Sequence, residues 1–393
     1  MSRRLISRSA DLQKLVEDGY HLEIWRGTFL LVRGIPYRTP LGQVRSGTLV
    51  SQLELANDVT VKPEQHVAYF VADETPSEVD GTPIKHMIGA FPQQLADGLV
   101  VTHTYSSKPP TGYADYRHKI SHYAALFVGP ARAADPFATA QVYPLISDAE
   151  DETVFLYADT AASRAGIDVI NDRLKPYRIG IVGLGGTGSY ILDLVAKTPV
   201  REIHLFDGDR FIQHNAFRAP GGHAGDDIAA VPQKVAHWGR VYGRLRRGIV
   251  EHDGAIDESN VHALRVLDFV FLTVDNGAAR RLIVTRLEEY QVPFVDVGMG
   301  VYEVDGALGG LVRTTTSTPE ERQHVHDKNR IPFGGGGADD YSLNIQIADL
   351  NALNATLAVI RWKKLVGYYG DQEREHHSLY QIGGNNIINE DLA

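Results

Sequence analysis

The residues with the clearest chemical potential are a glycine cluster and an acid that follows it. The cluster comprises Gly183, Gly185, Gly186 and Gly188. Glycines let the backbone turn tightly and approach a phosphate without a side-chain clash, and a helix that follows them points its free N–H groups at the anion. Asp207, placed about 20 residues further on, can accept hydrogen bonds from ribose hydroxyls. The pattern predicts a nucleotide site, for which NAD would be the default occupant.

The elements that must position these residues can be read from the surrounding pattern. The apolar run 179–182 indicates a buried parallel strand, 190–196 has the period of a helix, and 202–206 indicates a second strand. A further strand over 268–274 is expected to end at the same carboxyl edge, where ligands bind in doubly wound sheets. We therefore predict an α/β fold built on a Rossmann-like doubly wound sheet.

A second set of polar residues follows the glycine loop in a definite order. It consists of Asn215, Arg218, Lys234, Asp275, Asn276 and Arg280. With these residues the sequence resembles the ThiF/MoeB/ubiquitin-activating adenylyltransferase family. The signature of that family is a glycine loop, an aspartate, an Asn-x-x-Arg, a lysine and an Asp-Asn-x-x-x-Arg. The resemblance covers residues 160–367, and five matched elements in order are more specific than a glycine fingerprint alone.

The resemblance implies activation of a C-terminal carboxylate by MgATP, which requires cations and N–H donors placed around the phosphates in advance. Asp207 would hold the ribose, Asn215 and Arg218 would contact the phosphates, Lys234 would neutralise their charge, and Asp275 would be the magnesium-linked carboxylate. The implied ATP-binding set is Gly183, Gly185, Gly186, Gly188, Asp207, Asn215 and Asn276, and the implied catalytic set is Arg218, Lys234 and Asp275.

The resemblance also implies a homodimer, because family members take an arginine from the partner subunit, for which Arg164 is our candidate. Arg281, next to the matched Arg280, is interpreted as a surface residue, and Asp209 as a turn or capping residue.

The chain contains no cysteine, which excludes disulfides, Cys-type zinc sites and a thiolate nucleophile. Many relatives pass the acyl group to a cysteine or carry two Cys-x-x-Cys zinc pairs, and this chain departs from both patterns. Three alternatives stay open: direct transfer from an acyl-adenylate, an oxyester on a hydroxyl, or a pseudoenzyme scaffold, against which the intact site set argues. The candidate hydroxyls are Thr314, Thr315, Thr316, Ser317 and Ser342, with His324 or His326 as base.

The resemblance also bears on the substrate. A cysteine-free activating domain behind an N-terminal region resembles a bacterial type that is associated with ubiquitin-like conjugation, in some cases in antiphage defence. It implies a ubiquitin-like protein with a C-terminal glycine as substrate, and it allows for a conjugating-enzyme-like partner. A small peptide or a transfer-RNA carboxylate is the alternative substrate. The alternatives of another class are an NAD-dependent oxidoreductase and a non-catalytic nucleotide-binding adaptor.

Composition sets the outer limits of the interpretation. The chain has 393 residues and a formal net charge of -10, which argues against a protein that binds nucleic-acid backbones. No apolar run reaches the 18 or so residues that a membrane helix needs, and the N-terminus lacks a signal-peptide core, so we expect a cytoplasmic protein. We assign residues 1–150 to an N-terminal α+β domain, for partner or substrate binding, and 151–393 to a ThiF-like adenylation domain.

Other features lead to weaker expectations. His118 and His122 stand four residues apart and could bind a metal, although a structural pair is the commoner explanation. The segment 106–119 could grip a partner protein, although a structural loop is again commoner. Residues 34–38 are expected to form a loop, and 160–174 a single helix. The run 334–337 is interpreted as a hinge, and the Thr/Ser-rich run that ends at Pro319 as a loop. The last core helix is expected over 345–365, with an apolar side made of Leu350, Leu353, Leu357, Ile360 and Leu365.

Overall fold

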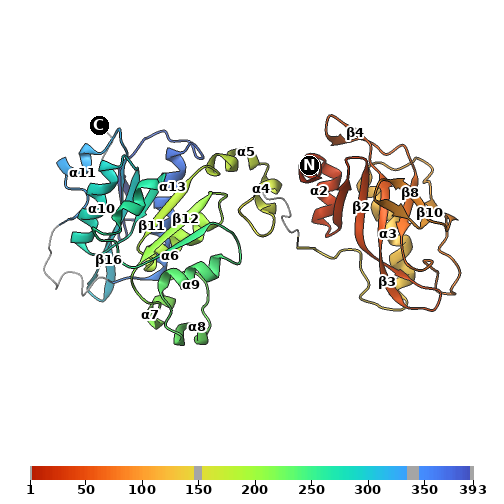
Figure 1. The fold of residues 1–393 in the computed structure, drawn as a ribbon, viewed down its shortest axis with the longest axis horizontal. Helices are drawn as coiled ribbons and strands as arrows, with labels where there is room; N and C mark the ends of the chain where they lie inside the picture. The colour runs from red at the N-terminus through yellow and green to blue at the C-terminus, as the bar shows by residue number, and fades with distance from the viewer. Residues whose placement is uncertain (1, 146–152, 334–344, 390–393) are drawn as a thin grey trace. The chain divides into compact units, whose positions relative to one another are not determined.

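The computed structural model describes residues 2–145, 153–333 and 345–389, and it divides into two compact units (Figure 1). The first unit comprises Met1–Ile146 with Ser163–Gly166, and the second comprises Ser147–Ala162 with Ile167–Ala393. Among the helices within these described ranges, none combines the length and the apolar character that crossing a membrane requires.

The first unit is a six-stranded antiparallel sheet in the order β1-β2-β3-β6-β10-β7. Its helix α3 packs against β2 and buries a set of aromatic side chains. The sheet strands are β1 (His21–Trp25), β2 (Phe29–Arg38), β3 (Val44–Gln52), β6 (Val67–Val71), β7 (Met87–Gly89) and β10 (His103–Ser106). The helices are α1 (Ser2–Arg8), α2 (Ala10–Glu17) and α3 (Tyr116–Arg132), and two small hairpins pair β4 (Leu55–Ala56) with β5 (Val59–Thr60) and β8 (Gln93–Ala96) with β9 (Leu99–Val101).

The predicted loop over 34–38 is wrong, because β2 continues to Arg38. The pairing with β3 shifts register at Gly34, as in a β-bulge, and then resumes with Pro36 opposite Ser46. The pairing of β2 with β1 ends at Arg33. Pro36 therefore stands where β2 has a neighbour on one side only, which is the position in a strand that tolerates a residue without an N–H.

The second unit is built on an eight-stranded sheet in the order β13-β12-β11-β14-β15-β16-β17-β18. The pairs from β13 to β15 are parallel and those from β15 to β18 are antiparallel. The strands are β11 (Arg178–Val182), β12 (Glu202–Asp207), β13 (Ile249–Asp253), β14 (Phe269–Leu272), β15 (Phe294–Val304), β16 (Ala307–Ser317), β17 (His377–Gln381) and β18 (Asn386–Asn389). The main helices are α6 (Gly186–Ala196), α9 (Lys234–Tyr242), α10 (Gly277–Glu289) and α13 (Ala348–Leu365). The two units together confirm the predicted fold class.

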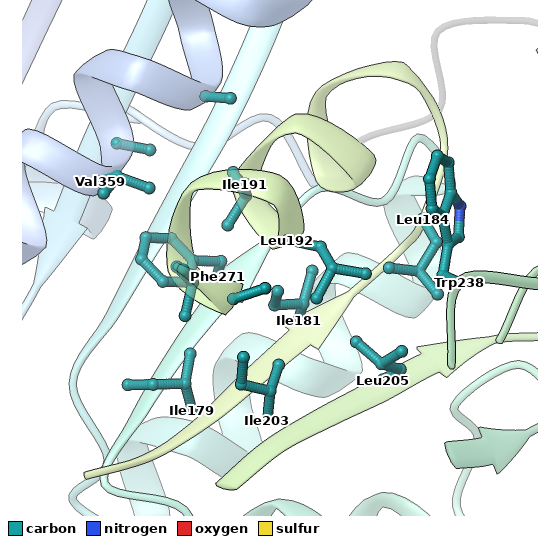
Figure 2. Close-up of a cluster of buried hydrophobic side chains, with 14 of the residues drawn as sticks. Ile179, Ile181, Leu184, Ile191, Leu192, Ile203, Leu205, Trp238, Phe271 and Val359 are labelled. Carbon is teal, nitrogen blue, oxygen red and sulfur yellow. The ribbon is translucent and has the colours of Figure 1, made fainter. Parts of the chain in front are cut away.

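The core of the second unit lies between the parallel strands and the helices α6, α9 and α13 (Figure 2). Alternate side chains of β11 and β12 point to one face, because strand side chains alternate with period two. Those of Ile181 and Ile203 meet Ile191 of α6 there, and Trp238 of α9 closes one end of the cluster. This packing fixes the glycine loop, since the loop joins β11 directly to α6.

The buried face of α13 differs from the predicted one. The buried residues of the helix are Leu350, Asn351, Asn354, Ala355, Ala358, Val359, Arg361 and Trp362, so of the predicted apolar side Leu350 alone is buried. Leu353 and Leu357 are half-buried and Ile360 is exposed. The leucine pattern was misleading because α13 packs closely against α6, where small side chains let the two helices approach.

The segment 160–174 also departs from expectation. It is broken into α4 (Thr160–Ala165), α5 (Asp168–Asn171) and the short 3-10 turn η1 (Asp172–Leu174). Gly166, a poor helix former, separates the first two pieces. Val169 in α5 is 80% exposed.

The observed face of α13 predicts where this helix tolerates extra volume. We expect Ala355→Leu to destabilise the second unit by about 1–3 kcal/mol, because it overpacks a fully buried position. Thr356→Leu, which adds a leucine at the neighbouring exposed position, should change the unfolding free energy by less than about 0.5 kcal/mol. Urea unfolding followed by tryptophan fluorescence measures both. Equal losses for the two variants would contradict the assigned face.

Candidate active site

A cavity of about 700 Å³ opens at the carboxyl edge of the parallel strands in the second unit. Its size is within the range of small-molecule sites, and its place is where doubly wound sheets bind ligands. The lining includes Gly183, Gly185, Gly186, Gly188, Asp207, Asp209, Arg218, Lys234, Thr273, Asp275, Asn276, Arg280, Gly298, Arg313, Asn351 and Asn354. The structure thus brings together nearly all the residues singled out in the sequence as a nucleotide site.

The glycine loop is shaped by close backbone contacts. Gly183 has a φ of +92°, a left-handed conformation that favours glycine. The Thr273 hydroxyl at the end of β14 donates a hydrogen bond of 2.7 Å to the Gly183 carbonyl. A Cβ at Gly188 would lie 1.9 Å from the same carbonyl oxygen. The loop and the first turn of α6 therefore require glycine at both positions, and their backbone borders the cavity without intervening side chains.

Asp207, the last residue of β12, ties the loop to the neighbouring strand. Its side chain is buried, and its carboxylate accepts hydrogen bonds from the backbone N–H groups of Leu184 at 2.6 Å and Asp209 at 2.8 Å. The ammonium group of Lys234 lies 3.4 Å from its Oδ1. A buried carboxylate needs such partners, because an unpaired one would be strongly destabilising.

Lys234 is the first residue of α9, and its side chain is only 7% exposed. Its Nζ lies 2.7 Å from Oδ2 of Asp209. Asp209 therefore provides an ion pair for the lysine. Its backbone carbonyl also accepts the N–H of Lys234 at 2.9 Å, which agrees with the interpretation of Asp209 as a turn or capping residue. The turn itself is made by the side chain of Asp207, which accepts the N–H of Asp209.

Arg218 contributes a second cation to the cavity. Burial lowers the pKa of its guanidinium, and the neighbouring carboxylates of Asp275 and Asp209 partly oppose that shift. Its Nε is buried and makes no hydrogen bond to any of the residues that the structure describes. Asp275 follows β14 and is exposed. This part of the cavity therefore combines a buried, unsatisfied donor with a carboxylate that faces solvent.

The two asparagines of the predicted site have structural hydrogen bonds of their own. Asn276 is the N-cap of α10, accepts the N–H of Ala279 at 3.0 Å and lines the cavity. Asn215 is buried, and its Oδ1 accepts the N–H of Ile212 at 2.9 Å. It is not among the residues that line the cavity. The phosphate contact predicted for Asn215 remains a prediction.

Several lining residues were missed at the level of sequence. Asn351 of α13 accepts a hydrogen bond of 2.9 Å from the hydroxyl of Thr187 in the glycine loop. Asn354, one turn later, donates to the carbonyl of Gly298 at 3.1 Å. Two asparagines three residues apart in an apolar helix were the available signal, because buried amides need partners. Arg313 of β16 carried no such local signal.

The candidate hydroxyl nucleophiles lie away from the cavity. Thr314–Ser317 belong to β16 and are buried between β15 and β17, so the predicted loop over this Thr/Ser-rich run is wrong. His324 contacts the Thr316 carbonyl at 2.9 Å, and His326 pairs with Glu288 at 3.0 Å. Ser342 and the glycine run 334–337 lie outside the described residues.

The remaining candidates of the first unit have local partners. The exposed Arg164 lies 3.4 Å from a carboxylate oxygen of Glu17. His122 contacts the hydroxyl of Ser107 at 2.9 Å, and His118 accepts the N–H of Ala114. No group of three or more metal-ligating side chains occurs within the described parts of the chain.

Residues 159–330 match the model of the ThiF family, and residues 10–160 match a model described as a domain of unknown function, DUF6791. Residues 159–330 therefore form a ThiF-family domain. Comparison with curated proteins gave no match for the chain.

Solved structures similar to the chain include E. coli MccB with MccA-N7isoASN and E. coli MccB with ATP, each at 17% identity and a TM-score of 0.45, covering 59% of this chain and 71% of that one. PaaA matches at 15% identity and a TM-score of 0.45, covering 58% of this chain and 76% of that one.

Helix α9 of the ThiF domain also carries a group that should make the domain sensitive to acid. Burial lowers the pKa of His237 to about 4, and the nearby His223 adds to the effect. An unfolded histidine titrates near 6.5, so between these values the unfolded chain binds more protons than the folded one. The free energy of unfolding should therefore fall as the pH drops from about 6.5 to about 4.

We predict that His237→Gln loses less stability over this pH range than the wild type, because the buried titrating group has been removed. Urea unfolding at pH 7.5, 5.5 and 4.5 provides the comparison. His262→Gln, at an exposed histidine, should retain the wild-type slope. The same acid sensitivity in both variants would show that other groups determine it.

Proposed function

We propose that the ThiF domain binds ATP in this cavity and uses it to activate a carboxylate as an acyl-adenylate. The observation that carries the proposal is the convergence of the glycine loop, Asp207, Lys234, Arg218 and Asp275 on one cavity at the carboxyl edge of the sheet. The glycine loop, Lys234 and Asp275 belong to segments far apart in the sequence. Their meeting at one cavity is therefore a property of the fold and not of local sequence pattern.

The residues fit a nucleotide triphosphate in charge and in shape. Asp207 ends the strand next to the glycine loop, in the place where an acid accepts ribose hydroxyls. The loop has no side chains to obstruct phosphates, and α6 begins directly behind it at Gly186. The buried, unsatisfied Nε of Arg218 would gain an acceptor from a phosphate oxygen. Lys234 could exchange its exposed partner Asp209 for phosphate while keeping Asp207.

Asp275 is the residue that would hold Mg²⁺. Its carboxylate is exposed at the cavity, and magnesium is commonly bound through one or two carboxylates together with substrate phosphates and water. The ion would neutralise charge on the phosphates.

The reaction is a displacement at the α-phosphorus of ATP. One oxygen of the acceptor carboxylate forms a bond to that phosphorus, and the bond to the oxygen bridging the α- and β-phosphates breaks. Pyrophosphate departs with the electron pair of the broken bond, which leaves the acyl-adenylate. Arg218 and Lys234 would stabilise the charge that builds on the phosphoryl oxygens.

The acceptor that we propose is the C-terminal glycine of a ubiquitin-like protein, with a shorter peptide as the alternative. This choice rests on the resemblance of the sequence motifs. The chain has no cysteine, and the described Ser/Thr candidates in β16 are buried away from the cavity. We therefore favour direct transfer from the adenylate to an external nucleophile. On the family resemblance we also propose that the chain acts as a homodimer.

The main test is ATP–pyrophosphate exchange with a panel of acceptors that end in glycine. We expect exchange by the wild type, and a loss of about 10²-fold or more in Arg218→Ala and in Asp275→Asn. The first removes a cation that stabilises the transition state, and the second removes the carboxylate that would hold Mg²⁺. Arg281→Ala changes an exposed arginine on α10 and should retain activity. Tight NAD binding without exchange for any acceptor would contradict the proposal.

A second test concerns covalent intermediates. Incubation with ATP and an active acceptor should leave the mass of the intact chain unchanged, because the buried hydroxyls of Thr314–Ser317 cannot reach the adenylate. Intact-protein mass spectrometry before and after mild alkali makes the measurement. An alkali-labile adduct on the chain would establish an oxyester instead, and peptide mapping would locate it.

A further inference from the structure

The half of the cavity formed by β15 and β16 contains a charge arrangement that the nucleotide contacts leave unexplained. Asp296 of β15 is fully buried and lies between two arginines. Nε of Arg280 is 3.2 Å from its Oδ1, and Arg313 donates to its Oδ2. The Arg280 contact is an ion pair without hydrogen-bond geometry, since both of its atoms lack a hydrogen-bond partner among the described residues. One carboxylate therefore faces two guanidinium groups, which leaves an excess of one positive charge.

The guanidinium of Arg280 is bound to the protein backbone and is almost fully buried. Its two terminal nitrogens donate to the backbone carbonyls of Pro332 and Val274, and its side chain is only 5% exposed. Arg313 is different. Its side chain is 14% exposed and lines the cavity, and among the described residues its hydrogen-bond partners are Asp296 and the hydroxyl of Thr315 at 2.6 Å. A guanidinium has five N–H donors, so Arg313 retains donors for a ligand.

The guanidinium of Arg313 is also held in place. Gly298 lies directly opposite on β15, and a Cβ at that position would come within 2.8 Å of the Arg313 Nη2. The guanidinium of Arg313 therefore occupies space that a side chain at position 298 would fill. A cation that is fixed by a buried carboxylate and by neighbouring packing is preorganised, so binding an anion costs it little conformational entropy.

A complementary acceptor stands beside this donor. Asn354 donates its amide N–H to the carbonyl of Gly298 at 3.1 Å. This hydrogen bond identifies the side-chain nitrogen, and the other terminal atom of the amide is therefore the oxygen. That oxygen is buried, and it has no hydrogen-bond partner within the described residues. The residue is only 1% exposed and lines the cavity. A buried amide oxygen without a donor is unfavourable, so a ligand N–H would satisfy it.

The sheet order separates this pair from the nucleotide. The strands run β12-β11-β14-β15-β16, with Asp207 at the first, the glycine loop after the second and Asp275 after the third. The nucleotide contacts therefore occupy the β12–β14 side. Arg313 and Asn354 border the β15–β16 side of the same cavity, where a second substrate can approach the phosphates.

We infer that Arg313 and Asn354 recognise the C-terminal residue of a peptide acceptor. Arg313 binds the terminal carboxylate, and the Asn354 oxygen accepts the amide N–H of the same residue. The inference rests on the proposed function and narrows its substrate class to chains that end in a peptide carboxylate. An acceptor carboxylate without a neighbouring N–H would leave Asn354 unsatisfied.

The experiment compares a fluorescein-labelled peptide ending in Gly-Gly with the same peptide carrying a C-terminal amide. Binding to the full chain is measured by fluorescence polarisation with a non-hydrolysable ATP analogue present. The wild type should prefer the acid by about 10- to 100-fold, as expected for a charge-assisted contact. Arg313→Gln should bring that ratio close to one, and Arg313→Lys should restore part of it.

Two further variants distinguish a loss of carboxylate recognition from a general loss of protein structure. Gly298→Ala should also reduce the acid preference, because it displaces the guanidinium without removing its charge. Arg286→Ala, at a surface arginine paired with Glu258 and Glu289, should leave the preference unchanged. Fluorescent-ATP binding should stay near wild type in all variants. The thermal midpoint should stay near wild type in Arg286→Ala and fall in Arg313→Gln, which leaves the buried Asp296 with Arg280 as its one arginine among the described residues.

The inference is overturned if Arg313→Gln retains the full acid preference, or if the wild type binds ATP but shows no preference for the acid. Both results would leave the nucleotide site standing. A wild type that fails to bind ATP at all would instead refute the proposed function, and the inference with it.

Discussion

The carboxylate of Asp207 is the contact on which the nucleotide half of the site depends. It receives backbone N–H groups from Leu184 in the glycine loop and from Asp209, and it lies beside the ammonium of Lys234. The loop after β11, the end of β12 and the start of α9 are therefore held together by one buried group. Leaving a buried charge unpaired would cost several kcal/mol. This cost stabilises the relative positions of the three segments in the absence of ligand.

A second buried carboxylate, Asp296, holds the opposite half of the cavity, and the comparison explains the division of the site. Lys234 faces two carboxylates, Asp207 and Asp209, so this group keeps an excess of one negative charge, which the guanidinium of Arg218 at the same cavity offsets. Asp296 faces two guanidinium groups, so its surroundings keep an excess of positive charge. A fixed positive excess in a partly desolvated cavity favours an anion there. The cavity is thus suited to two anionic ligands. The glycine loop borders the place of the nucleotide, and the positive excess around Asp296 borders the place of the second anion.

The parts of this fold that depend on local pattern could be predicted, and those that depend on packing partners could not. The strand, glycine loop and helix at 179–196 follow from residue type and spacing alone. The buried face of α13 was misjudged, because small residues such as Ala355 and Ala358 face α6 and hydrophobic periodicity favours leucine instead. The run Thr314–Ser317 was taken for a loop although threonine favours strands. The pairing of its first two residues with β17, a strand distant in the sequence, is one that no local signal reveals.

The juxtaposition of Arg313 with Asp296 is an intermediate case, because the sequence contains the information in a form that is easily missed. Asp305 and Gly306 have φ values of 52° and 75°, which are the conformations of a two-residue hairpin turn with an Asp-Gly sequence. Such a turn fixes the register of both flanking strands, and Val304 indeed pairs with Ala307. Counting back from the turn places Arg313 opposite Gly298, and the period of two puts Asp296 on the same face. Recognising the turn would therefore have predicted that Arg313 lies beside Asp296 and that Gly298 leaves space for its guanidinium.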